Sequence, residues 1–259
     1  MGQNKIMLKK RIIPTLLWKN YTLVKGINFD SWRTVGSVLP SIKVYNFREV
    51  DELIIVDILS TINEQEIDYT SVEEFSQECF VPLTIGGGVD HINKVEKLLR
   101  SGADKVCINS ASYVDPSLIE KAAYKFGEQC VVASIDVRKS DGGKHFCYSH
   151  SGTRPTNIDV IEWAKEMQDR GAGEILLTSI DNDGTMKGYD LELICKITNI
   201  LKIPVIASGG AGSYSDMLEA FTQSNASAVA AASIFHFTEM TPKEAKNFLA
   251  NNGINVRIF

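Results

Sequence analysis

Short apolar runs alternate along the chain with segments of helical spacing. The runs are rich in Val, Ile and Leu and lack a polar residue at every second position, which is typical of strands buried on both faces. Eight such runs occur, at residues 11–17, 52–57, 82–85, 105–108, 130–135, 174–178, 204–207 and 228–231. Between them, pairs such as Val95 and Leu98 place apolar side chains on one helical face, and Asp115-Pro116 predicts a helix with proline at its first position.

Eight strand–helix units fit either a closed (β/α)8 barrel or a doubly wound open sheet. An internal repeat separates the two. At an offset of 122, residues 51–58 fall on the similar residues 173–180 and 85–89 fall on 207–211, and at 123 residues 102–106 fall on 225–229. A period near half the chain indicates two half-barrels whose open sheet edges close each other. We therefore predict an α/β fold, a TIM barrel with a half-barrel internal repeat, as a single domain over residues 1–259.

Composition narrows the class of protein. With 44% hydrophobic residues, 23% charged residues and seven prolines, the chain is neither disordered nor of low complexity. A net charge of −5 is unlike the basic character of nucleic-acid-binding domains. No apolar run approaches the roughly 20 residues that span a bilayer, and five scattered cysteines suit a reducing compartment. We expect a cytoplasmic protein with neither nucleic acid nor membrane as partner.

Two glycine-rich turns follow the third and seventh runs. Gly86–Gly88 and Ser208–Gly212 let the backbone approach an anion and point N–H groups at it. The next runs lead into Asn109-Ser110-Ala111 and Ala232-Ser233, small residues that would complete each turn. A single glycine triplet is usually only a tight turn. Two related turns half a chain apart instead predict an elongated ligand with a phosphate at each end.

Carboxylates stand where the fifth and sixth runs end. Asp136 ends the fifth run, and Asp181 and Asp183 follow the sixth. Such groups at the ligand-facing rim serve as general acids or bases, although each alone could be a helix cap or a structural ion pair. Setting residues 12–17 on 131–136 places Leu17 opposite Asp136. A symmetric two-acid mechanism therefore lacks its carboxylate on the first strand.

The four histidines show no spacing that suits a metal. We interpret them as surface or capping residues and expect neither a metal nor a cofactor. They are His91, His145, His150 and His236.

Seven motifs follow one another in order along essentially the whole chain: Lys10-Arg-Ile-Ile, Val24-Lys-Gly, Ile85-Gly-Gly-Gly, Gly102-Ala-Asp-Lys-Val, Ser179-Ile-Asp-Asn-Asp-Gly-Thr, Ile206-Ala-Ser-Gly-Gly-Ala-Gly and Gly253-Ile-Asn-Val-Arg. With these motifs the chain resembles the cyclase subunit of imidazole glycerol phosphate synthase. The resemblance implies a barrel that forms a heterodimer with a glutaminase. Ammonia released there would pass through the barrel to a bisphosphorylated ribulosyl intermediate, giving imidazole glycerol phosphate and an aminoimidazole carboxamide ribotide.

The resemblance also implies roles for individual residues. Asp136 and Asp183 match the family's acids at the barrel mouth. The implied phosphate-binding residues are Gly87, Gly88, Asn109 and Ser110 at one site, and Ser208, Gly209, Gly210, Ala232 and Ser233 at the other. The implied ammonia gate at the opposite end, which could also be ordinary salt bridging, consists of Arg11, Glu52, Lys105 and Glu174, with Asp104 beside it meeting the glutaminase.

Departures from the family pattern are local. The family's first strand ends in a catalytic aspartate where this chain has Leu17, and residues 18–22 and the long loop at 25–39 also differ. Such changes resemble a paralogous branch associated with sugar amidation in surface-polysaccharide synthesis. We thus favour an ammonia-conducting subunit over an active lyase of histidine biosynthesis. A third alternative is a stand-alone isomerase of phosphorylated sugars. We disfavour it because it gives no role to the charged residues implied at the ammonia gate.

Overall fold

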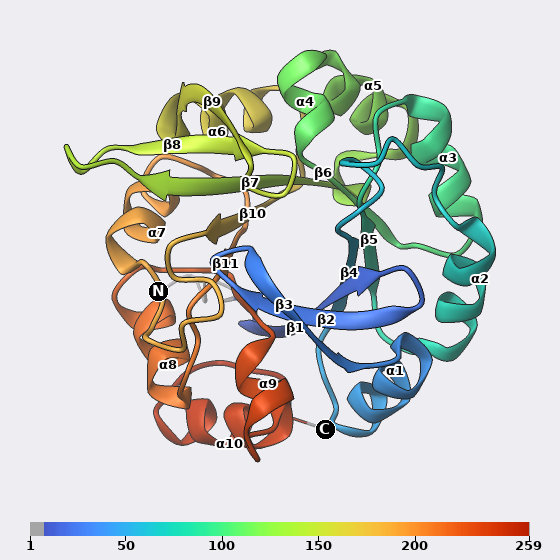
Figure 1. The fold of residues 1–259 in the computed structure, drawn as a ribbon. Helices are drawn as coiled ribbons and strands as arrows, with labels where there is room; N and C mark the ends of the chain where they lie inside the picture. Colours follow the sequence, from blue (N-terminus) through green and yellow to red (C-terminus); the bar gives the residue numbers. More distant parts are fainter. Residues whose placement is uncertain (1–7, 259) are drawn as a thin grey trace, which may run out of the picture.

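Eight parallel strands form the centre of the computed structural model, which describes residues 8–258. Neighbouring strands pair in parallel around the ring, and β12 pairs with β1, with Ala228 opposite Arg11. The strands are β1 (Arg11–Lys19), β4 (Leu53–Asp57), β5 (Leu83–Gly86), β6 (Lys105–Ile108), β7 (Val131–Lys139), β10 (Glu174–Ser179), β11 (Val205–Ser208) and β12 (Ala228–Ala231). The ring is closed, so the predicted (β/α)8 barrel is confirmed and the open sheet is excluded (Figure 1).

Helices surround the barrel because each buries one apolar face against the strands (Figure 1). They are α1 (Val38–Phe47), α2 (Tyr69–Glu78), α3 (Ile92–Arg100), α4 (Ser110–Val114), α5 (Ser117–Phe126), α6 (Val160–Asp169), α7 (Leu191–Thr198), α8 (Tyr214–Thr222), α9 (Ser233–Phe237) and α10 (Pro242–Asn251), with the 3₁₀ turn η1 (Glu128–Cys130). The sequence predicted proline as the first residue of this helix, but Pro116 is instead the N-cap of α5.

Two antiparallel hairpins extend from the carboxyl ends of β1 and β7. The first consists of β2 (Thr22–Ile27) and β3 (Asp30–Gly36), and the second of β8 (His145–Ser149) and β9 (Arg154–Asp159). Both lie over the same end of the barrel, which we call the mouth (Figure 1). The segment described from the sequence as a long loop is therefore largely β-structure. Its turn at Asn28 and Phe29 has φ values of +53° and +63°, and asparagine tolerates this left-handed region.

The predicted half-barrel repeat recurs in local structure. The five-residue helices α4 and α9 begin at Ser110 and Ser233, which differ by 123 positions. Asp68 and Asp190 differ by 122, and each is the N-cap of its helix, accepting a hydrogen bond from the backbone N–H three residues on. Equivalent segments of the two halves thus end strands and begin helices in the same way.

Inward-facing residues form layers along the barrel axis. At the strand starts, which we call the lower end, these are the charged side chains of residues 11, 52, 105 and 174. Above them lies an apolar layer of Ile13, Ile54, Cys107, Val132, Leu176, Ile206, Ala228 and Ala230. Because the outward faces of the strands are buried beneath helices as well, the alternation of two faces is hidden in the sequence.

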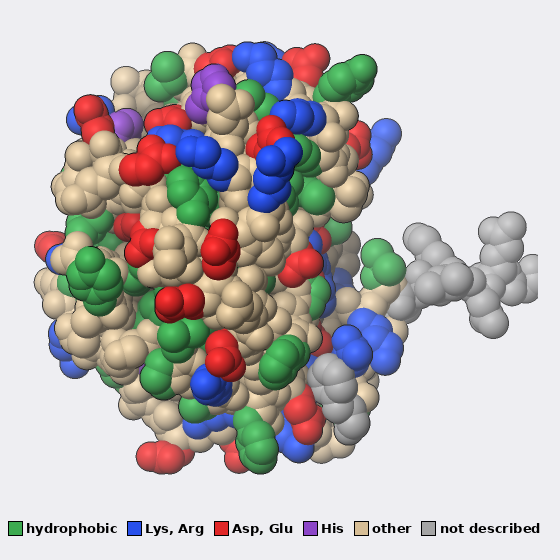
Figure 2. All heavy atoms as spheres, turned by 90° about the vertical axis from the view of Figure 1, so that its right-hand side faces the viewer, with side chains coloured by type: hydrophobic (Ala, Val, Ile, Leu, Met, Phe, Trp, Pro, Cys, Tyr) green, Lys and Arg blue, Asp and Glu red, His purple; other side chains and the backbone are tan. Residues whose placement is uncertain are grey.

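Within residues 8–258 no helix is long and apolar enough to span a membrane. On the side of the molecule that carries α2 and α3, acidic and basic side chains are interspersed (Figure 2).

Candidate active site

A cavity of about 510 Å³ opens at the barrel mouth. Strand ends supply most of its lining, while Phe29 and Trp32 come from the first hairpin and His150 and Ser151 from the second. Apart from Asp181, the cavity brings together the catalytic and phosphate-binding residues expected at the mouth, and Leu17 with them: Leu17, Gly87, Gly88, Asn109, Ser110, Asp136, Asp183, Ser208, Gly209, Gly210, Ala232 and Ser233. Residues spread over the whole sequence therefore face one space.

The two glycine turns have backbones that other residues rarely adopt. Gly87 and Gly88 have φ values of +102° and +68°, and Gly209 and Gly210 have +90° and +116°. A Cβ atom at Gly87 would lie 2.1 Å from the carbonyl oxygen of Asp57, and one at Gly210 would lie 2.0 Å from that of Gly188. Close packing thus requires glycine, and the same tight turns bring backbone to the cavity wall.

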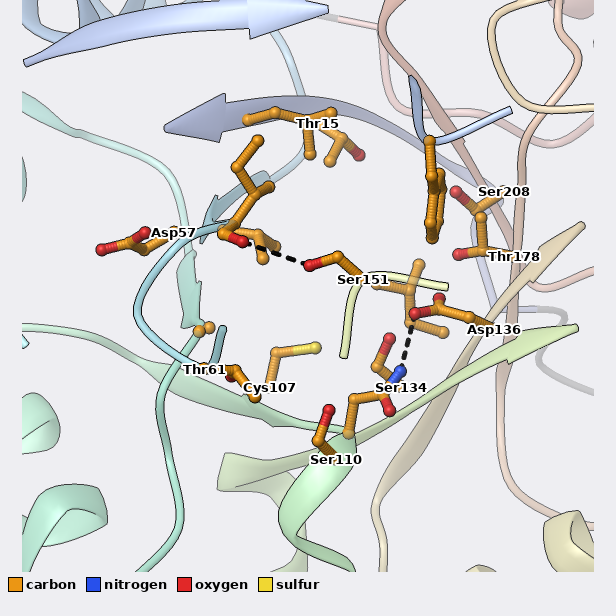
Figure 3. Close-up of a pocket in the computed structure, with 18 of the residues that line it drawn as sticks. Thr15, Asp57, Thr61, Cys107, Ser110, Ser134, Asp136, Ser151, Thr178 and Ser208 are labelled. Carbon is orange, nitrogen blue, oxygen red and sulfur yellow. Dashed lines mark hydrogen bonds between the residues drawn. The ribbon is translucent and has the colours of Figure 1, made fainter. Parts of the chain in front are cut away.

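The first glycine turn is covered by two distant segments. The Gly88 N–H donates to Thr61 Oγ1 over 3.1 Å, and the His150 N–H donates to Ser110 Oγ over 2.9 Å. Ser151, at the tip of the second hairpin, donates to the Ile58 carbonyl over 3.2 Å (Figure 3). The tip thus crosses the mouth from β7 to the segment after β4, and a ligand entering the first turn meets these contacts.

Asp136 and Asp183 lie on the wall of the cavity in different surroundings. Asp183 forms an ion pair with Lys25, whose side chain is 2% exposed. Asp136 accepts a hydrogen bond of 2.7 Å from Asn109 Nδ2 (Figure 3). Burial and the nearby Asp183 carboxylate raise the pKa of Asp136 to about 7, against hydrogen bonds from Thr178 and Asn109 that lower it. A carboxyl that titrates near neutrality suits proton transfer in either direction.

Replacing Asp136 with asparagine should flatten the dependence of stability on pH. The raised pKa means that Asp136 favours folding below pH 4, and this contribution is lost as pH rises through 7. The wild-type protein should therefore lose roughly 2 kcal/mol more than Asp136→Asn between pH 5 and pH 8. Urea unfolding at both pH values measures the difference. Equal losses in the two proteins would contradict the assignment.

Asp181 does not belong to the cavity, contrary to its grouping with the other rim acids. Its carboxylate accepts from the Lys139 N–H at 2.9 Å and from the Arg138 guanidinium at 3.2 Å. These contacts tie β7 to the segment after β10. Asp181 is thus the structural ion pair that the sequence left open as an alternative.

Leu17 occupies the place on β1 that Asp136 occupies on β7. Ile13 and Val132 share the apolar layer, and one layer higher Thr15 and Ser134 both line the cavity. Leu17 and Asp136 follow at the next inward position, and both line the cavity too. The structure therefore supports the alignment of the two strands. A leucine side chain offers neither a proton nor a charge at this position.

Several cavity residues were not expected from the sequence. Lys25 lies in the Val24-Lys-Gly motif, but the motif did not indicate its ion pair with Asp183. No sequence motif pointed to Lys94.

The four histidines differ in their surroundings. His91 caps α3 as expected, and His150 lines the cavity. His145 is buried and lies 3.0 Å from Asp190, so its assignment as a surface or capping residue was wrong. Partial burial lowers the pKa of His236 to about 4.

At the lower end, four side chains form what we call the charged ring. Arg11 contacts Glu52 at 2.6 Å and Glu174 at 2.8 Å, and Lys105 contacts the same two carboxylates at 2.9 and 3.3 Å. Each charge therefore has two opposite neighbours. Asp104, beside the ring, is exposed, and its carboxylate accepts a 2.8 Å hydrogen bond from the Leu83 N–H.

Comparisons with known proteins agree on one family. The family model described as "Histidine biosynthesis protein" matches residues 11–241. The imidazole glycerol phosphate synthase subunit HisF of Chlorobaculum parvum is 46% identical over 252 residues, which cover 97% of this chain and 100% of that protein. The same subunits of Chlorobaculum tepidum and Pelodictyon phaeoclathratiforme are 45% and 44% identical over the same shares.

Proposed function

Because this chain belongs to the HisF family of imidazole glycerol phosphate synthase cyclase subunits, we propose that it binds a glutaminase and conducts ammonia to its mouth. The acceptor would be a phosphorylated ligand held by the two glycine turns, and the first-strand acid of the cyclase reaction would be missing. The ammonia would serve the amidation of a sugar in surface-polysaccharide synthesis.

The observation that carries this proposal is Leu17 on the cavity wall opposite Asp136. Loss of a general acid or base typically lowers a rate by about 10²–10⁴-fold. Such a loss is difficult to reconcile with a biosynthetic flux that depends on cyclization. Ammonia transfer needs no acid at this position, so a conducting subunit can tolerate the leucine.

The route for ammonia is supported by the barrel interior. Above the charged ring, the layer of Ile13, Ile54 and the other apolar residues includes the small side chains of Ala228 and Ala230. Higher still, the hydroxyl of Thr15 is buried without a hydrogen-bond partner among the described residues. Neutral ammonia passes apolar surfaces at lower cost than ammonium, and the free hydroxyl gives it a polar contact at the wall of the cavity.

A lower-end interface is supported by exposed apolar side chains. Leu8 precedes β1, Phe47 ends α1 and Phe80 precedes β5, and they are 80%, 87% and 81% exposed. Asn46 links the last two, since its Oδ1 accepts from the Phe80 N–H at 3.2 Å. Exposed aromatic side chains beside charged groups are typical of protein interfaces.

The alternative is an active cyclase subunit of histidine biosynthesis. It is favoured by Asp136 and Asp183, which remain in the cavity, and by the pKa of about 7 for Asp136. An assay with the glutaminase partner, glutamine and the ribulosyl bisphosphate separates the two functions. Cyclase turnover equal to that of a family member with the first-strand aspartate would favour the alternative.

Reversing the charge of Asp104 should weaken the complex with the glutaminase. In Asp104→Lys, a cation would stand at the interface where an anion is expected, and association should weaken at least about tenfold. Asp104→Asn is the control for structure, since its amide oxygen still accepts from the Leu83 N–H. Sedimentation of mixed subunits measures the affinity. If even the unmodified chain binds no glutaminase, ammonia conduction loses its basis.

A further inference from the structure

The charges on the cavity wall are unbalanced. Two lysines, Lys25 and Lys94, face six carboxylates, which are Asp57, Glu64, Asp90, Asp115, Asp136 and Asp183. Lys25 is buried in its ion pair with Asp183. Among the described residues of the lining, Lys94 is therefore the one lysine or arginine outside a buried ion pair. A ligand with two phosphates adds further negative charge to an acidic cavity, so its binding depends on such a cation.

Lys94 lies beside the first glycine turn. It belongs to the first turn of α3, and its Nζ lies 3.2 Å from the Gly88 carbonyl oxygen and 3.0 Å from Asp90 Oδ2. Its side chain is 19% exposed, whereas that of Asp90 is 62% exposed. An ammonium group has three N–H donors, and these two contacts leave one for a ligand. The carbonyl contact also holds the ammonium at the turn, which reduces the entropy cost of binding.

The second glycine turn has no counterpart. In the described lining, the residues around it are Ser208, Gly209, Gly210, Ala211, Ala232 and Ser233, and none is charged. The two turns share backbone conformation and position in the repeat but differ in charge. They are therefore not equivalent sites for an anion.

We propose that Lys94 is the cationic contact for the phosphate at the first glycine turn. The second turn would hold its phosphate with backbone N–H groups and hydroxyls alone. This inference rests on the proposed function, in which both turns bind phosphate. Phosphate binding at the first turn should then depend more strongly on ionic strength than binding at the second turn. An elongated ligand with two different phosphate ends would also have a preferred orientation in the cavity.

Calorimetric titration with inorganic phosphate tests the role of Lys94. Lys94→Gln removes the charge but keeps an N–H donor for the Gly88 carbonyl, so the conformation of the glycine turn should be retained. One of two binding events should weaken about tenfold, because hydrogen bonds to charged groups are the stronger ones. The dependence of that event on ionic strength should also fall. Lys94→Arg should restore both properties.

Lys97→Gln is the matched control. Lys97 lies on the same helix, is 60% exposed and has Glu66 at 3.8 Å, so its loss changes net charge equally without touching the cavity. It should leave both binding events unchanged. Equal phosphate binding by the wild-type protein and Lys94→Gln would overturn the role of Lys94 while leaving the phosphate sites in place. If the wild-type protein binds no phosphate, both the inference and the phosphate sites of the proposed function fail.

Discussion

Replacing Leu17 with aspartate should raise turnover of the ribulosyl bisphosphate by up to about 10²–10⁴-fold, the usual contribution of a general acid or base. Leu17 lines the cavity at the inward position of β1 that matches Asp136 on β7. An aspartate there would face the cavity and stay solvated, so the change should not disturb the core. Steady-state assays with ammonium salts, which bypass the glutaminase, measure the effect directly.

Leu17→Asn is the matched control, because asparagine has nearly the size of aspartate but transfers no proton. Rescue by aspartate alone would show that proton transfer was missing. The gain should fall short of full activity if, as the family resemblance implies, residues 18–22 and the first hairpin also differ from an active cyclase. High activity in the unmodified protein, or equal effects of both substitutions, would contradict the role given to this position.

Gly210→Val should abolish phosphate binding at the second glycine turn. The φ of +116° is strained for valine, and the Cβ would lie 2.0 Å from the Gly188 carbonyl oxygen, so the turn must shift away from its present path. Displaced N–H groups no longer converge on an anion. Calorimetry with inorganic phosphate should then show one binding event in place of two.

The remaining event at the first turn serves as an internal control for folding. Gly142→Ala is a second control, since the nearest atom to its Cβ lies 4.0 Å away and its φ is not in the left-handed region. It should bind phosphate as the wild-type protein does. Unchanged phosphate affinity in folded Gly210→Val would refute the assignment of this turn.

The barrel was predictable because its strands are buried on both faces and its halves repeat. The runs at 105–108 and 228–231 match β6 and β12 residue for residue. The first hairpin was not predicted, since β2 and β3 mix polar and apolar positions and no residue of β3 is buried. Strand order alone indicates which residues approach the mouth but not how they pair there. Strand position therefore placed Asp136 at the rim but could not separate Asp183, paired with Lys25, from Asp181, paired with Arg138. Only the family resemblance singled out Asp183.

The pairing of β1 with β12 has a consequence for synthesis of the chain. Arg11 lies opposite Ala228, so the barrel closes only when nearly the whole sequence has left the ribosome. Until then one edge of β1 presents unpaired backbone groups, which favour pairing with other nascent chains. Contacts between such distant positions also slow folding. We therefore expect the edge of β1, the strand that carries Leu17, to stay open to such pairing for most of the synthesis of the chain.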